Sequence, residues 1–166
     1  MLDNITRYLE GITEAKSRRH LQYIAEPIGD RMSSQALVTA GLVISATKPK
    51  AKTGASTSYY CVNGVLVSIA AGTDMAALTG PTYATTLINV FCFFVDSAGN
   101  KTSAGGTAAT TLAGVKWPQF PKNKALIGFI IATASGDFVP GGTDLDTGTT
   151  VYVSPIGAFD PTILTG

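Results

Sequence analysis

Apolar residues gather in a few short runs that are rich in β-branched and aromatic side chains. The two longest, Leu87–Val95 and Ala125–Ala134, are bounded by Gly, Pro, Asn or Asp, which is typical of buried strands. Successive residues of a strand point to opposite faces, and in Leu87–Val95 apolar residues occur at positions of both kinds. We therefore expect this strand to be covered on both faces. Gly128, inside the second run, predicts a β-bulge or a close approach of another backbone.

Two shorter runs flank a strong turn signal. Thr57–Val62 and Val65–Ile69 are separated by Asn63-Gly64, a dipeptide suited to a type I′ turn because both central residues must take positive φ. This pattern predicts a β-hairpin. Thr149–Val153 alternates as a last strand.

Three further segments complete the β region. Ala36–Ile44 is a short apolar run that we expect to open the first strand. Asp96–Asn100 has the composition of a tight turn. Ser103–Gly114 consists mainly of small residues and threonines, which predicts an extended, loosely packed edge or loop.

A helical pattern is confined to residues 3–26. Apolar residues recur at three- and four-residue spacing, at Leu2 just before this stretch and then at Ile5, Leu9 and Ile12. Charged residues are also concentrated in this first fifth of the chain, which holds 10 of the 23, and the composition changes sharply afterwards. We therefore expect a helical arm over 1–33 and a β domain over 34–166, with the arm's apolar stripe covered either by the chain's own sheet, by sister copies or by a host surface. The fold class predicted is mainly β: an antiparallel β-sandwich or jelly-roll-like domain with an N-terminal α-helical arm.

Composition adds a constraint on the surface. Hydrophobic residues make up 45% of the 166 residues and charged residues only 14%, which favours a surface partly used in contacts with itself or a partner. The formal net charge of +1 gives no reason to expect a nucleic-acid partner. No run approaches the roughly 20 apolar residues of a membrane span, and the start lacks the features of a signal peptide, so we expect no membrane partner and synthesis in a cytoplasm.

Residues suited to catalysis are few. The single histidine, His20, lies in the charged helix, and the usual zinc and phosphate motifs are absent, so we expect neither an enzyme nor a metal or cofactor. Asp144 and Asp146 could seat calcium, although a turn in which they accept backbone amides is the alternative. Cys61 and Cys92 fall inside predicted strands. We expect them to be buried, reduced thiols; the alternative is a disulfide, which requires that they lie on facing strands at bonding distance.

Two features suggest contact surfaces. Three lysines surround a proline at Lys48, Lys50 and Lys52; they could meet an acidic partner, or they could form a solvated loop or protect a sheet edge. Trp117 lies among prolines with a second ring, Phe120, either as a ligand-facing aromatic or as part of a plug at the end of the sandwich.

The order of motifs after residue 87 resembles a known class of proteins. An Asp96-Ser-Ala-Gly99 turn follows a strand and leads, through a small-residue spacer, to a Pro-x-x-Pro segment at 118–121. Ile127–Ile131 and then Phe138–Asp146, which reads Phe-Val-Pro-Gly-Gly-Thr-Asp-Leu-Asp, complete the order. This looks like the β-rich structural proteins of tailed bacteriophages, in particular head decoration (cement) proteins and head fibres, over roughly residues 58–153.

The resemblance implies a structural virion protein rather than an enzyme. A decoration protein binds the outside of a phage head in many copies and stabilises contacts between major capsid subunits, so the implied partners are the major capsid protein and the chain itself, as a homotrimer on the capsid surface. The alternative is a head fibre or tail component that adheres to host carbohydrate through Tyr59, Tyr83 and Trp117. For decoration, the expected capsid or subunit contacts are Leu2, Ile5, Leu9, Ile12, Arg18, Arg19, Lys48, Lys50 and Lys52.

Overall fold

The chain is mainly β, and its strands pair antiparallel. A computed structural model describes residues 15–19, 25, 29 and 32–159. Within them the elements are β1 (Ser34–Ala36), β2 (Val43–Ile44), β3 (Ala51–Lys52), β4 (Ser58–Val62), β5 (Val65–Ile69), β6 (Ile88–Asp96), β7 (Lys101–Gly105), a 3-10 turn η1 (Leu112–Gly114), β8 (Lys124–Thr133) and β9 (Thr149–Val153).

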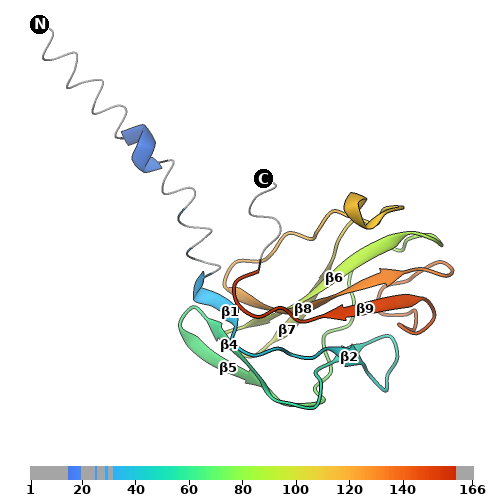
Figure 1. The fold of residues 1–166 in the computed structure, drawn as a ribbon, viewed down its shortest axis with the longest axis horizontal. Helices are drawn as coiled ribbons and strands as arrows, with labels where there is room; N and C mark the ends of the chain where they lie inside the picture. The colour runs from blue at the N-terminus through green and yellow to red at the C-terminus, as the bar shows by residue number, and fades with distance from the viewer. Residues whose placement is uncertain (1–14, 20–24, 26–28, 30–31, 160–166) are drawn as a thin grey trace, which may run out of the picture.

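These strands form three antiparallel sheets. One has the order β1-β4-β5, the second pairs β2 with β3, and the third has the order β7-β6-β8-β9. The first and third sheets face each other across a hydrophobic cluster to which both contribute, with Tyr60 and Val62 on one side and Phe91, Phe93 and Ile130 on the other. This arrangement is consistent with a β-sandwich (Figure 1).

The long strands β6 and β8 are covered on both faces, as the sequence predicts. On the face away from the first sheet a second cluster contains Cys92, Phe94 and Phe129. It is closed by Val115 and Phe120, which lie in the segment that follows β7 and is drawn in gold in Figure 1. The chain therefore covers both faces of its central sheet with its own residues.

The predicted bulge lies in the middle of β8. The register of β6 against β8 shifts between Phe93, which is opposite Gly128, and Phe94, which is opposite Leu126. Ile127 is the extra residue, and its side chain joins the first cluster together with Ile130. Ile127 and Ile130 are three positions apart, and in a regular strand residues an odd number of positions apart point to opposite faces. The bulge lets both side chains point to the same face.

The turns form where their local chemistry predicts them. Asn63 and Gly64 have φ values of 50° and 78° and join β4 to β5, which confirms the hairpin. At the β6–β7 turn the Asp96 carboxylate accepts the backbone N–H groups of Ala98 and Asn100 at 3.0 and 2.9 Å, while Gly99 has a φ of 83°. β9 coincides with the predicted last strand.

The prediction for Ala36–Ile44 is wrong in its position. β1 ends at Ala36, where the apolar run begins, and only Val43 and Ile44 at its far end form a strand. The backbone N–H groups of Leu37 and Val38 both donate to the carbonyl of Tyr59, so the ladder with β4 stops there. Gly41 then takes a φ of 55°, which turns the chain away.

The N-terminal helix prediction falls largely outside the described residues. Residues 15–19 are helical and exposed, and Figure 1 draws them apart from the sheets. The extent of the arm, the division at residue 33 and a jelly-roll topology stay predictions.

Candidate functional site

The predicted contact residues of the arm are only partly described. Leu2, Ile5, Leu9 and Ile12 lie outside the described residues, as does His20. Arg18 and Arg19 lie in the exposed helical segment 15–19. Their part in a contact stays a prediction.

The predicted lysine loop is the connection between β2 and β3. The N–H of Ser45 donates to the carbonyl of Lys50 at 2.9 Å, and the N–H of Lys50 donates to Thr47 at 2.9 Å, which closes a tight turn. Lys50 and Lys52 are half-buried, whereas Lys48 at the tip is exposed. The segment is thus a turn followed by a short strand at a sheet edge that carries Lys52, and contact with an acidic partner stays a prediction.

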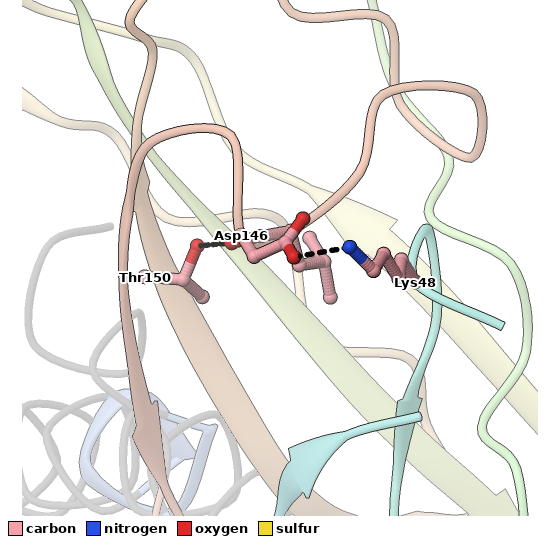
Figure 2. A network of polar contacts seen from close by, with 4 residues as sticks. Lys48, Asp146 and Thr150 are labelled. Atoms are coloured by element: carbon pink, nitrogen blue, oxygen red, sulfur yellow. Dashed lines mark hydrogen bonds and ion pairs between the residues drawn. The ribbon is translucent and has the colours of Figure 1, made fainter. Parts of the chain in front are cut away.

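Lys48 is bound to a loop that is distant in the sequence. Its Nζ lies 2.7 Å from Oδ2 of Asp146 (Figure 2). Its carbonyl accepts the N–H of Leu145 at 3.1 Å. The hydrogen bond from Lys48 lowers the pKa of the Asp146 carboxyl, and the same bond raises the pKa of the lysine. Leu145 is buried, and Thr150 donates its hydroxyl to the Leu145 carbonyl at 2.7 Å. The pair therefore fastens the β2–β3 turn to the loop before β9.

This pairing bears on the calcium alternative for Asp144 and Asp146. The Asp146 carboxylate is already engaged by Lys48, while the carbonyl of Asp144 accepts the N–H of Thr147 at 3.1 Å within a turn. Within the part of the chain that the structure describes, no group of three or more His, Cys, Asp or Glu residues is placed to hold a metal ion.

A hollow of about 480 Å³ lies beside Lys52. Its wall combines residues of two connections, the one after β3 and the one after β5, with Lys52 of β3 and one apolar residue of β2. The lining residues are Val43, Lys52, Thr53, Gly54, Ala55, Ala71 and Gly72. The chemistry available there is a single ammonium group next to a mainly apolar wall.

Trp117 is half-buried in the second hydrophobic cluster. Its ring meets Phe129 edge-on at a centroid distance of 4.8 Å and Phe159 at 5.7 Å. These contacts make Trp117 part of the cover on the outer face of the β6–β8 pair rather than a plug at the end of the sandwich. The partly exposed edge of Trp117 leaves a ligand-facing role as a prediction.

The two tyrosines named for adhesion have different surroundings. Tyr59 is 42% exposed, but Tyr83 is only 6% exposed, so the prediction that Tyr83 is an exposed aromatic is wrong. The Tyr83 ring stacks on Phe138 at 5.0 Å, and its hydroxyl donates to the carbonyl of Ala132 at 3.2 Å. Burial strongly raises the pKa of this phenol.

Sequence reasoning missed a surface on the outer side of the β1-β4-β5 sheet. The register places Tyr59 and Cys61 on the same face as Leu66 and Ser68, and Leu66 is 66% exposed. The sequence did contain an indication of this surface. In Tyr59-Tyr60-Cys61-Val62 and in Val65-Leu66-Val67 the residues that face either side of the strand are apolar. No charged residue occurs between Lys52 and Asp74.

Neither cysteine forms a disulfide. Cys61 lies on this outer surface and is half-buried, whereas Cys92 is buried in the second cluster on a different sheet. The disulfide alternative is therefore wrong.

No helix among the described residues is both long enough and apolar enough to cross a membrane. Comparisons with family models, with curated protein sequences and with solved structures find no match for this chain.

Proposed function

We propose that this chain is a structural virion protein that decorates the outside of a tailed-phage head and stabilises contacts between major capsid subunits. In this proposal it acts without catalysis or cofactor, and copies associate as a trimer through the apolar stripe of an N-terminal helical arm. Arg18, Arg19, Lys50 and Lys52 face the shell. Lys48 contributes less, because Asp146 already binds its ammonium group.

The observation that supports the proposal is that the motif residues that carry the resemblance to phage head proteins hold turns or are buried in the core. The Asp96 carboxylate holds its own turn through backbone N–H groups. Phe138 and Leu145 are buried in the core, and the Thr143 hydroxyl accepts the N–H of Val139 at 2.8 Å. Motif residues engaged in this way maintain a scaffold, which is what a shell-binding protein requires of its domain.

The test is to label virions of the phage that encodes this sequence with an antibody raised against the purified chain. Many copies over the head, counted by electron microscopy, are the expected result. Labelling confined to the tail would overturn the decoration proposal in favour of adhesion, and absence of labelling would overturn both.

A truncation and a charge reversal examine the contact residues. Deleting residues 1–31 is expected to abolish trimer formation or shell binding and to leave the β domain folded. The Lys50→Glu and Lys52→Glu double variant should weaken shell binding, whereas Lys122→Glu, at an exposed lysine on the turn before β8, is the matched control. Unaltered binding of the truncated protein would contradict the role of the arm.

The alternative is a head fibre or tail component that binds host carbohydrate, and the exposure of Tyr59 favours it. Sugar rings commonly stack on accessible aromatic faces. Binding of host polysaccharide, measured by isothermal titration calorimetry and lost in Tyr59→Ala, would support adhesion. No measurable binding by the wild-type chain would count against it.

A further inference from the structure

The outer edge of β5 is an uncovered sheet edge. The order β1-β4-β5 leaves β1 and β5 at the two sides of their sheet. The β1 side is covered, because the N–H of Gly157 donates to the carbonyl of Ala36 at 2.8 Å. Among the described residues, no backbone hydrogen bond reaches the outward side of β5.

The hairpin fixes which backbone groups of β5 point outward. In a two-residue hairpin the residues that flank the turn, Val62 and Val65, form a hydrogen-bonded pair, and hydrogen-bonded pairs then alternate along the ladder. Val67 and Ile69 therefore also direct their backbone groups to β4. Leu66 and Ser68 direct their N–H and C=O groups away from the sheet, and both residues are exposed.

This edge carries none of the usual protections against pairing. Exposed edges of native sheets are blunted by charged side chains, by proline or by a bulge. β5 is Val-Leu-Val-Ser-Ile, its register with β4 is regular, and residues 53–73 contain no charged side chain. A partner strand would meet neither a steric block nor a repelling charge.

We propose that β5 pairs antiparallel with β5 of a second copy of this chain around a two-fold axis through Val67. Directly opposite residues must project to the same face, so such an axis has to pass through a residue rather than between two residues. An axis through Val67 uses the whole strand: Val65 lies opposite Ile69 of the partner subunit, and Leu66 lies opposite Ser68 of the partner subunit. An axis through Leu66 or Ser68 would place turn or loop residues opposite the strand.

This register satisfies the groups that are open in the single chain. The Leu66–Ser68 pair occurs twice across the axis, and each occurrence exchanges two backbone hydrogen bonds. The two Leu66 side chains become diagonal neighbours about 7–8 Å apart between Cα atoms, within reach of one another. With Tyr59 and Cys61 on the same face, the apolar surface continues across the axis.

A second copy fits this edge because an antiparallel strand is its own complement about a two-fold axis. Residues 53–73 carry no charged side chain that could pair with a charged partner. For the same reason two copies can approach each other at this edge without electrostatic repulsion. The pairing is a property of the free chain and does not rest on the proposed function. If trimers form through the arm, it would join protomers of different trimers.

Disulfide trapping tests the register. Two single variants, Leu66→Cys and Ser68→Cys, are made in a Cys61→Ser background, because Cys61 lies directly opposite Leu66 within the hairpin. Hydrogen-bonded pairs have Cα atoms about 5.5 Å apart, within the range that a disulfide spans. When the variants are mixed under reducing conditions and then oxidised, we expect covalent dimers at least about 10-fold faster than for either variant alone. Equal rates in the mixture and in the separate proteins would overturn the register and the pairing.

A proline substitution tests the edge without a new cysteine. Ser68→Pro removes an N–H that points outward and leaves the ladder with β4 intact, a position at which strands tolerate proline. We expect Ser68→Pro to lose the concentration-dependent association that wild type and the control Ser68→Ala show in sedimentation, with an unchanged far-UV circular dichroism spectrum. Leu66→Lys, at an exposed side chain, should lose it as well and covers the case in which the proline variant does not fold. Association of folded Leu66→Lys or Ser68→Pro protein at the wild-type level would refute the proposal.

Discussion

Replacing Gly128 by alanine should destabilise the chain, because the new Cβ would clash with a backbone atom and rotation of a side chain could not remove the clash. A Cβ at this position would lie 2.5 Å from the carbonyl oxygen of Val153 and 2.7 Å from Cδ1 of Leu42. The leucine methyl is the end of a flexible side chain and can move. The Val153 oxygen belongs to β9, where Val153 is paired with Phe129 of β8, so it can move only by shifting the strand.

The magnitude follows from opposing effects. Forcing an extra carbon into a packed site costs about 1–3 kcal/mol, and a weakened ladder hydrogen bond adds about 1 kcal/mol. Alanine restricts the unfolded chain relative to glycine, which returns about 0.4–1 kcal/mol. We expect a net loss of about 1–3.5 kcal/mol in the free energy of unfolding, or roughly 2–14 °C in Tm for a domain of this size.

Urea unfolding followed by Trp117 fluorescence is the suitable assay, because this single tryptophan contacts Phe129 beside the bulge. Gly136→Ala is the matched control: that glycine is exposed, and a Cβ there would meet nothing within 4 Å. It should leave stability unchanged or raise it by up to about 1 kcal/mol. A Gly128→Ala variant as stable as Gly136→Ala would refute the argument that the bulge excludes a side chain.

Three other substitutions test single interactions. Asn100→Ala should raise the pKa of Asp96 toward its ordinary value, because the Asn100 amide is the main cause of its lowering; a carboxyl carbon NMR titration with no change would contradict this. Lys48→Met should likewise raise the pKa of Asp146. Since that pKa is lowered in the folded chain, the stabilisation by the pair is fully present above the unfolded value and is lost as the pH falls through the folded pKa, so the variant should have a flatter acid limb of stability against pH. Tyr83→Phe should cost about 0.5–1.5 kcal/mol by deleting a buried hydrogen bond, and an unchanged urea midpoint would show that the bond contributes nothing.

Local chemistry predicted the parts of the fold that depend on few neighbouring residues. Asn63-Gly64 is sufficient to specify its turn because positive φ at both positions is a property of the dipeptide. The double-sided burial of β6 and the bulge at Gly128 were also predicted, since each leaves a compositional trace in one strand. The boundaries of β8 and β9 follow from their flanking turn residues.

Features that join distant segments left no such trace. Lys48 and Asp146 are far apart in the sequence, and nothing near either residue marks the other as its partner. Tyr83 has the composition of an accessible aromatic in a loop, but its bridge to Phe138 buries it. The outer surface of the β1-β4-β5 sheet was not predicted, because whether an apolar face is buried or open depends on which sheet covers it.

The arrangement of the two clusters explains why association can be tested separately from folding. β6 and β8 supply most of the large buried side chains, and both faces of their sheet are closed within the chain. β5 lies at the margin of the facing sheet, and its outward residues Leu66 and Ser68 contribute to neither cluster. Substitutions at sites that share no partners act independently on stability, so changes to the β5 edge should leave the core unaffected. A change in assembly caused by Leu66→Lys would therefore report on the surface itself rather than on a loosened core.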